Sequence, residues 1–335
     1  MVQAGASFAA GRLAEAVAAA RGLAAGADAP AEARQLAEAV EDCSRVFADL
    51  RVDLKFKPAG ERLTAARGRL AGLGDLAAGA IARLDGWIER VAAAEQLTKT
   101  MVVIGGGKVR TATGVVDVAP FFLAPTEVSQ REFAAFLDDV DAACRAAGAE
   151  TWAARLDVIN KRTQDVLPKA ALAQQLLERR SSLSQGDLPV DTLSWYEAAA
   201  YARWQHLALP IEVEWQLAAF GPDGATHTFP WGDAWSNDAI FDRSERVRVD
   251  DRGPSWRQGA IAIHHLAGNV AEWLDADPKG TSGFLAGGCY KDRGGEAEAQ
   301  AKGRLRRADL VQTRPGQGLR VVLRLDTLFG GELPR

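Results

Sequence analysis

Hydrophobic residues in the first hundred positions recur at alternating spacings of three and four. One series runs through Leu36, Val40, Cys43, Phe47 and Leu50, and Ile81, Leu84, Ile88 and Val91 repeat the spacing. This period places one apolar stripe on each helix. Gly and Pro residues interrupt the pattern. The pattern predicts an all-α bundle of three or four helices over residues 1–99, whose stripes form its core or associate with a second copy.

Beyond residue 100 the pattern changes to short apolar runs separated by turns. Residues 101–104 and 115–123 are apolar runs typical of strands. Ser129 with Glu132, and Ser194 with Glu197, have the spacing of a capping box, in which each side chain bonds the backbone N–H near the other. A further helix is predicted near Pro210.

Two other stretches stand out in this second region. Residues of about 138–187 are helical in character and highly charged, which indicates an insertion that forms a surface elaboration or a docking surface. From residue 220 onward Gly and Asp are frequent and strands are short. Five tryptophans of the region are expected in the core: Trp195, Trp204, Trp215, Trp231 and Trp273.

Composition narrows the class of protein. The chain of 335 residues has a formal net charge of −4, which argues against nucleic-acid binding. It has neither an apolar leader nor a run long enough to span a membrane, so we expect a cytoplasmic protein with no membrane partner. Its three cysteines are far apart, which argues against a disulfide framework and against a zinc knuckle.

Seven short motifs occur in a fixed order between residues 101 and 324. They are Glu127-Val128-Ser129, Pro189-Val190 with Ser194-Trp195, residues 209–215 (LPIEVEW), residues 230–233 (PWGD), residues 267–273 (AGNVAEW), Gly287-Gly288, and Gly318-Leu319-Arg320. In this order they resemble the formylglycine-generating enzyme (sulfatase-modifying factor) family. The resemblance implies a bacterial protein with an α+β, C-type lectin-like domain over residues 100–329, with little regular structure, behind the helical bundle.

The resemblance also implies which residues catalysis would need. The family's oxidases hold copper with two cysteines shortly after the Gly-Gly element, whereas this chain has only Cys289 there and no cysteine from residue 291 to its end. The family's iron-dependent branch uses histidines in an N-terminal helical domain, but the first histidine here is His206. We therefore expect neither a copper nor an iron site. Cys289 is either a buried substitute for serine or a nucleophile, which would need a lowered pKa.

The family's calcium sites have partial equivalents. Gly268, Val270 and Glu272 are candidate ligands at one site, although His265 replaces the usual acidic residue. Asn237 and Asp238 are candidates at a second site. His264 and His265 are expected on a strand that points one ring inward and one outward.

The segment after the Gly-Gly element is rich in basic residues. The candidate ligand-binding residues are Tyr290, Lys291, Arg293, Arg304, Arg306, Arg307 and Arg314. They form either a solvated surface or a recognition surface for an acidic peptide, protein or phosphate. We therefore predict a non-catalytic recognition or scaffolding protein. The alternatives are an oxidoreductase with a rearranged site at Cys289 and a retroelement-diversified receptor, which the composition of residues 294–317 does not favour.

Overall fold

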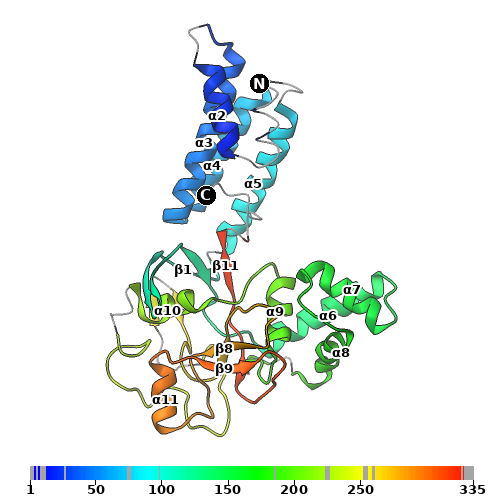
Figure 1. Ribbon diagram of the computed structural model, residues 1–335, viewed down its shortest axis with the longest axis vertical. Coiled ribbons are helices and arrows are strands. Elements are labelled where there is room, and N and C mark those ends of the chain that lie inside the picture. The colour runs from blue at the N-terminus through cyan, green and yellow to red at the C-terminus, as the bar shows by residue number, and fades with distance from the viewer. Residues whose placement is uncertain are drawn as a thin grey trace. The chain divides into compact units, whose positions relative to one another are not determined.

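The computed structural model describes residues 4, 7, 13–25, 28–73, 77–97, 99–184, 186–222, 227–251, 256–258, 261–325 and 327. The chain forms two compact units (Figure 1). One comprises residues 1–100, 119–121 and 324–335, and the other comprises residues 101–118 and 122–323. The boundary between residues 100 and 101, where the first unit gives way to the second, falls beside the boundary expected at residue 99. The domain limits 1–99 and 100–329 themselves stay predictions.

The first unit consists of helices that pack in sequence order, each against the next. They are α2 (Leu13–Ala24), α3 (Ala31–Asp53), α4 (Phe56–Ala71) and α5 (Ala78–Leu97). The expected stripe of α3 is buried from Leu36 to Leu50. The stripe predicted for α5 is only partly correct, because Ile81 and Ile88 are half-buried. Trp87 takes the core position instead, and its ring meets the edge of Phe47 at 4.7 Å between centroids.

The second unit contains short strands in small sheets. Its strands are β1 (Val102–Ile104), β2 (Gly107–Thr111), β3 (Gly114–Val118), β4 (Phe121–Leu123), β5 (Trp256–Gln258), β6 (Ile261–Ile263), β7 (Ala271–Trp273), β8 (Ser282–Ala286), β9 (Arg306–Asp309), β10 (Gln317–Gly318) and β11 (Val322–Arg324). One sheet has the order β10-β7-β8-β9 and another the order β1-β4-β11, while β2-β3 and β5-β6 are hairpins. The single strand expected over 115–123 is wrong: β3 and β4 are separate because Pro120 lacks a backbone N–H for a ladder.

Helices surround these sheets. They are α6 (Gln130–Ala146), α7 (Trp152–Thr163), α8 (Ala170–Glu178), the 3₁₀ turn η2 (Arg179–Ser182), α9 (Trp195–Trp204), α10 (Glu212–Phe220) and α11 (Gly294–Ala301). Figure 1 shows α6, α7 and α8 on one side of the β8–β9 strands and α10 and α11 on the other. None of the helices in the part that the structure describes is both long and apolar enough to cross a membrane.

The capping boxes predicted at Ser129 and Ser194 are confirmed. Each serine hydroxyl accepts the N–H of the glutamate three residues later, and the glutamate carboxylate accepts the serine N–H, at the starts of α6 and α9. At α10 the cap residue is Ile211, which offers no side-chain bond, and only the Glu214 carboxylate accepts the Ile211 N–H at 2.9 Å.

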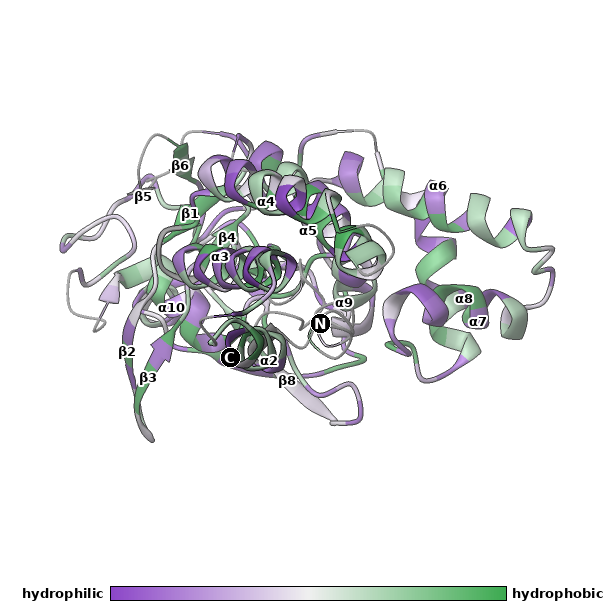
Figure 2. Ribbon diagram, turned by 90° about the horizontal axis from the view of Figure 1, so that it is seen from above, coloured by the Kyte–Doolittle hydropathy of each residue, from purple (hydrophilic) through white to green (hydrophobic). Residues whose placement is uncertain are grey.

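The segment expected to be a helical insertion is helical, and its apolar side belongs to the main core. Ile159, Leu172 and Leu176 are at most 5% exposed and join the cluster that contains Trp195 and Trp273. Figure 2 shows hydrophobic and hydrophilic residues alternating along α6, as amphipathic packing requires. That the segment is an insertion, and that it docks a partner, stays a prediction.

Candidate functional site

A buried ion pair occupies the centre of the second unit. The Arg320 Nε donates to the Glu272 Oε1 at 2.7 Å, and the side chains are 0% and 1% exposed. The Trp215 Nε1 donates to the other carboxylate oxygen at 2.9 Å. Each oxygen of Glu272 therefore accepts a hydrogen bond, one from Arg320 and one from Trp215, and calcium binding at Glu272 stays a prediction.

The other nitrogens of Arg320 connect further segments to this pair. Nη1 donates to the carbonyl of Ala124 at 3.0 Å, and Nη2 donates to the carbonyl of His264 at 2.6 Å. A guanidinium presents donors in a fixed fork, so it can bind a carboxylate and two backbone segments together. The ion pair therefore fixes how strand β7 meets the segments at Ala124 and His264.

The bend formed by Gly268 and Asn269 contributes a second set of contacts. Gly268 has a φ of 89°, and a Cβ there would lie 2.9 Å from the Ile240 carbonyl oxygen, so only glycine fits. The Asn269 Oδ1 accepts the Val247 N–H at 2.9 Å, and its Nδ2 donates to the Glu127 Oε2 at 3.4 Å. The bend therefore serves the architecture.

Glu127 is a second buried carboxyl group beside the same arginine. It is fully buried, and its Oε1 has no hydrogen-bond partner. Burial, with the negative charge of Glu272, raises the pKa of Glu127 to about 8 against the opposing charge of Arg320. Two carboxyl groups facing one guanidinium leave one of them protonated at neutral pH.

The two histidines do not lie on a strand, so that expectation is wrong. They follow β6, and His265 has a φ of 52°, in the left-handed region, which breaks strand alternation. His265 is 2% exposed, and burial lowers its pKa to about 4. Within the described ranges, no group of three or more His, Cys, Asp or Glu residues is arranged to hold a metal.

The remaining calcium candidates lie elsewhere. Gly268 and Val270 belong to the bend, and the Gly268 N–H donates to the Gly287 carbonyl. Asn237 and Asp238 are exposed, and the Asn237 carbonyl accepts a hydrogen bond from Arg243 at 2.9 Å. Calcium binding at these residues stays a prediction.

Cys289 lies in a closed environment. It is 2% exposed, and a Cβ built on Gly316 would lie 2.5 Å from its Sγ, so the backbone covers the thiol. Burial raises the pKa of the Cys289 thiol, and the nearby Asp292 raises it further. The nucleophile interpretation requires a lowered pKa, whereas this environment raises it, which favours the interpretation of Cys289 as a buried substitute for serine. The Asp292 carboxylate instead accepts the Cys289 N–H at 2.7 Å.

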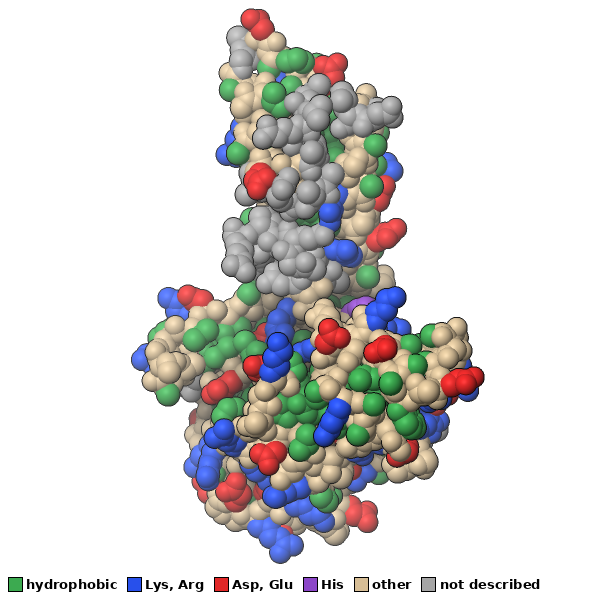
Figure 3. All heavy atoms as spheres, turned by 45° about the vertical axis from the view of Figure 1, so that its right-hand side comes forward, with side chains coloured by type: hydrophobic (Ala, Val, Ile, Leu, Met, Phe, Trp, Pro, Cys, Tyr) green, Lys and Arg blue, Asp and Glu red, His purple; other side chains and the backbone are tan. Residues whose placement is uncertain are grey.

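The basic residues after the Gly-Gly element divide into paired and unpaired side chains. Ion pairs join Arg306 to Asp292, Arg293 to Asp242 and Arg304 to Glu296, at 3.0, 2.8 and 3.3 Å respectively. Arg307 donates a hydrogen bond to the Ser282 hydroxyl, and the Arg314 side chain is exposed. Tyr290 is buried, with 5% of its surface exposed, and the Lys291 Nζ lies 4.9 Å from the centroid of its ring. Figure 3 shows basic and acidic side chains interspersed over one face. Much of the predicted recognition surface is therefore neutralised locally.

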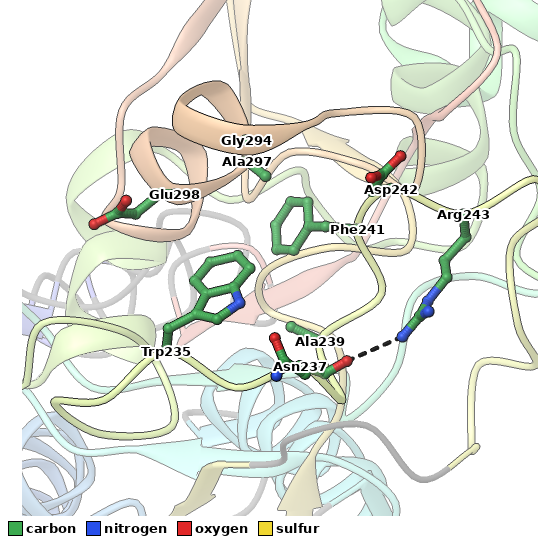
Figure 4. A pocket seen from close by; sticks show the side chains of 9 residues that line it. All are labelled: Trp235, Asn237, Ala239, Phe241, Asp242, Arg243, Gly294, Ala297 and Glu298. Atoms are coloured by element: carbon green, nitrogen blue, oxygen red, sulfur yellow. Dashed lines mark hydrogen bonds between the residues drawn. The ribbon is translucent and has the colours of Figure 1, made fainter.

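The structure also forms a pocket that the sequence analysis did not identify (Figure 4). It has a volume of about 540 Å³ and lies between α11 and the loop over residues 235–243. Trp235, Phe241 and Arg243 line it. Trp231, which was expected in the core, is only half-buried and packs beside Trp235 at 6.0 Å. The density of aromatic residues from 229 to 241 was the available signal.

Comparisons with known proteins agree with the motifs. The chain is 28% identical over 179 residues to a hercynine oxygenase of Mycolicibacterium smegmatis, covering 51% of this chain and 40% of the relative. It is 30% identical over 195 residues to a formylglycine-generating enzyme of Streptomyces coelicolor, covering 49% and 60%. The chain thus matches less than two thirds of either relative.

Among solved structures, CarF covers 68% of this chain and 98% of its own, at 17% identity and a TM-score of 0.43. Treponema denticola variable protein 1 covers 67% and 94%, with a TM-score of 0.41. The model of the sulfatase-modifying factor enzyme 1-like domain matches residues 89–325, which is most of the chain. The chain therefore belongs to the family of sulfatase-modifying factor enzyme 1-like domains.

Proposed function

We propose that this family member is a non-catalytic recognition protein that binds a protein or peptide partner through the loops of its C-terminal face. The environment of Cys289 carries the proposal. Its thiol is covered by Gly316, and burial raises its pKa. A thiol acts as a nucleophile or a copper ligand in its thiolate form, which burial disfavours.

The sequence around Cys289 supports the same proposal. No cysteine follows it in the chain, so the pair of thiolates that the family resemblance implies for copper has no second member. The segment that follows the Gly-Gly element holds the Asp292–Arg306 ion pair next to Cys289 instead. This pair is an arrangement that orders loops.

The N-terminal helices have a separate role in the proposal. Their stripes are satisfied within the unit, since the buried residues of α3, α4 and α5 pack on one another. The bundle therefore serves as an independently packed module that tethers the recognition domain or pairs with a second copy. Size-exclusion chromatography with light scattering on the full chain tests the second role, which a monomer at micromolar concentration would contradict.

The absence of catalysis is tested with the full-length protein, copper and oxygen. A thiol peptide is incubated with the protein and Cu(I), and aldehyde formation and oxygen uptake are followed. We expect no turnover above that of copper alone. Turnover above that of copper alone, and abolished by the substitution Cys289→Ser, would overturn the proposal, whereas turnover equal to that of copper alone in both proteins would support it.

Thiol reactivity provides a second, independent readout. All three cysteines are buried, so we expect the native protein to react with a thiol reagent such as DTNB only at the rate at which it unfolds. Addition of urea should then release the three thiols together. A single thiol that reacts within seconds in the native protein, and that disappears in Cys289→Ser, would contradict the proposed inert role.

A further inference from the structure

The pocket between α11 and residues 235–243 has an aromatic wall. Trp235 is 40% exposed, which is unusual for a side chain of its size. Neighbouring rings nevertheless hold it, because its ring forms T-shaped pairs with Phe229 and Trp231, at 5.6 and 6.0 Å between centroids, and lies 5.7 Å from the Phe241 centroid. A fixed and exposed indole presents a flat surface to a second ring at little conformational cost.

The opposite side of the pocket is built from small residues. Gly294 and Ala297 of α11 face the cavity, as Figure 4 shows, and nothing lies within 4 Å of a Cβ built on Gly294. The volume of about 540 Å³ is enough for a large aromatic side chain with part of its backbone. The cavity is therefore shaped for a ring that slides between the helix and Trp235.

The acidic side chains at the pocket are already neutralised. Asp242 pairs with Arg293 at 2.8 Å, and Glu298 pairs with Lys302 at 2.6 Å. Figure 4 shows the Asp242 and Arg243 side chains pointing away from each other. These carboxylates contribute little free negative charge to a ligand.

Two basic side chains at or beside the pocket, Arg243 and Lys291, are bonded to backbone carbonyls and not to carboxylates. The Arg243 Nη2 donates to the Asn237 carbonyl at 2.9 Å, and the Lys291 Nζ donates to the Ser244 carbonyl at 3.4 Å. A carbonyl carries no formal charge. Over the residues that the structure describes, neither Arg243 nor Lys291 has a carboxylate within 4.0 Å. The guanidinium retains donors that suit a carboxylate in two-pronged geometry.

These two cations belong to neighbouring segments. The Arg243 N–H donates to the Tyr290 carbonyl at 2.8 Å, and the Asp242 N–H donates to the Asp292 carbonyl at 2.9 Å. Arg243 lines the pocket, whereas Lys291 lies outside its lining. The positive charge thus continues from the pocket onto the adjacent surface, beyond the reach of a ligand confined to the cavity.

We propose that this pocket is the specificity pocket for a protein segment that carries an aromatic side chain flanked by acidic residues. The aromatic side chain lies against Trp235 beneath α11, and the acidic residues pair with Arg243 and Lys291. This inference rests on the proposed recognition function and names the chemistry of its partner. A small aromatic acid would use the pocket and Arg243 but would leave Lys291 without a contact.

Fluorescence anisotropy with the full-length protein tests the inference. The probe is a labelled, capped pentapeptide in which one tyrosine is flanked by two aspartates on each side. The control probes replace the tyrosine with alanine, or the four aspartates with lysines. We expect the acidic tyrosine peptide to bind at least tenfold more tightly than either control, with an affinity that falls as salt is raised, because the contacts with Arg243 and Lys291 are exposed.

Substitutions then locate the site. Arg243→Gln should weaken binding of the acidic tyrosine peptide at least fivefold, and Arg243→Glu should weaken it further. Trp235→Ala should remove the preference for tyrosine over alanine. Arg145→Gln is the matched control, since Arg145 is an exposed arginine on α6 and its loss removes the same charge. It should leave the affinity unchanged.

Three results would overturn the inference. They are equal binding of the acidic and basic peptides, equal binding by wild type and Arg243→Gln, and binding of free hydroxyphenylacetate as tight as that of the peptide, which would favour a small acid. Arg243 is exposed, so its variants keep the test valid even if Trp235→Ala disturbs folding. Failure of this peptide to bind would leave the proposed function standing, because that proposal is contradicted by catalytic turnover or by a reactive Cys289 thiol and does not name the chemistry of the partner.

Discussion

Two arginines of the second unit, Arg320 and Arg243, differ in burial and therefore in what the side chain can do. Arg320 is 0% exposed and is bonded to Glu272, Ala124 and His264. Arg243 is exposed and is bonded to one carbonyl. A buried charge must be fully satisfied, so it specifies structure, whereas an exposed and partly satisfied charge remains available to a partner.

The largest expected effect comes from breaking the buried pair. The substitution Arg320→Met should lower the free energy of unfolding by about 3–5 kcal/mol, because it leaves the Glu272 carboxylate buried without its cation. Urea unfolding followed by tryptophan fluorescence measures this. The exposed Arg307, replaced by Gln, is the control and should change stability by less than about 0.5 kcal/mol. A loss below about 1 kcal/mol in Arg320→Met would show that the pair does not hold the loops.

The next effect concerns the proton on Glu127. The pKa of Glu127 is about 8 in the folded state, above the ordinary 4.5. The folded protein therefore binds more protons than the unfolded chain between these values, so the stability from this group is complete below pH 4.5 and is lost as pH rises through about 8.

The substitution Glu127→Gln imitates the protonated acid and removes this dependence. The difference in unfolding free energy between Glu127→Gln and wild type should grow in favour of the variant from pH 5 to pH 8, by at most about 1.4 kcal/mol per pH unit. Urea titrations at four pH values measure it. Parallel curves for the two proteins would mean that Glu127 is ionised throughout.

A smaller effect is expected at a local feature, the capping box of α9. Ser194→Ala removes the hydroxyl that accepts the Glu197 N–H and should cost about 1 kcal/mol. Thermal unfolding followed by circular dichroism measures the loss. The control is Ser194→Asn, which places a new cap acceptor at the same buried position and should recover part of the lost stability. Ser194→Ala as stable as wild type would show that the core alone fixes this helix start.

The smallest effect is a gain at the start of α10. Ile211 is 40% exposed and supplies no cap bond. Ile211→Thr adds a hydroxyl acceptor and should raise stability by about 0.5–1 kcal/mol. Ile211→Val, which lacks the hydroxyl, should not reproduce the gain. A destabilised threonine variant would mean that the apolar contacts of Ile211 exceed the value of a cap.

Local features were predictable because their bonding partners lie close in sequence. The capping boxes at Ser129 and Ser194 join residues three positions apart, and the α3 stripe repeats within one helix. The predictions failed where a single residue changed the backbone. His265 adopts a left-handed conformation, and Pro120 divides an apolar run into two strands. Spacing alone contains neither fact.

The candidate site was only partly predictable for the same reason. The absence of a second cysteine after Cys289 is plain from the chain, and it already argued against copper. The charges at the loop face could be counted, but not paired. Arg306 pairs with a carboxylate, that of Asp292, whereas the Arg243 side chain bonds with a carbonyl. This difference depends on which segments the fold brings together.

The sequence by itself determined the family, through seven motifs in order, and the helix starts, through bonds between near neighbours. Only the tertiary structure decided that Glu272 bonds with Arg320, 48 residues away, and with Trp215, 57 residues away. It also decided that residues 235–243 and α11 enclose a pocket. The physical reason is that a buried carboxylate takes whichever donors the packed chain brings to it, and these are set by long-range contacts.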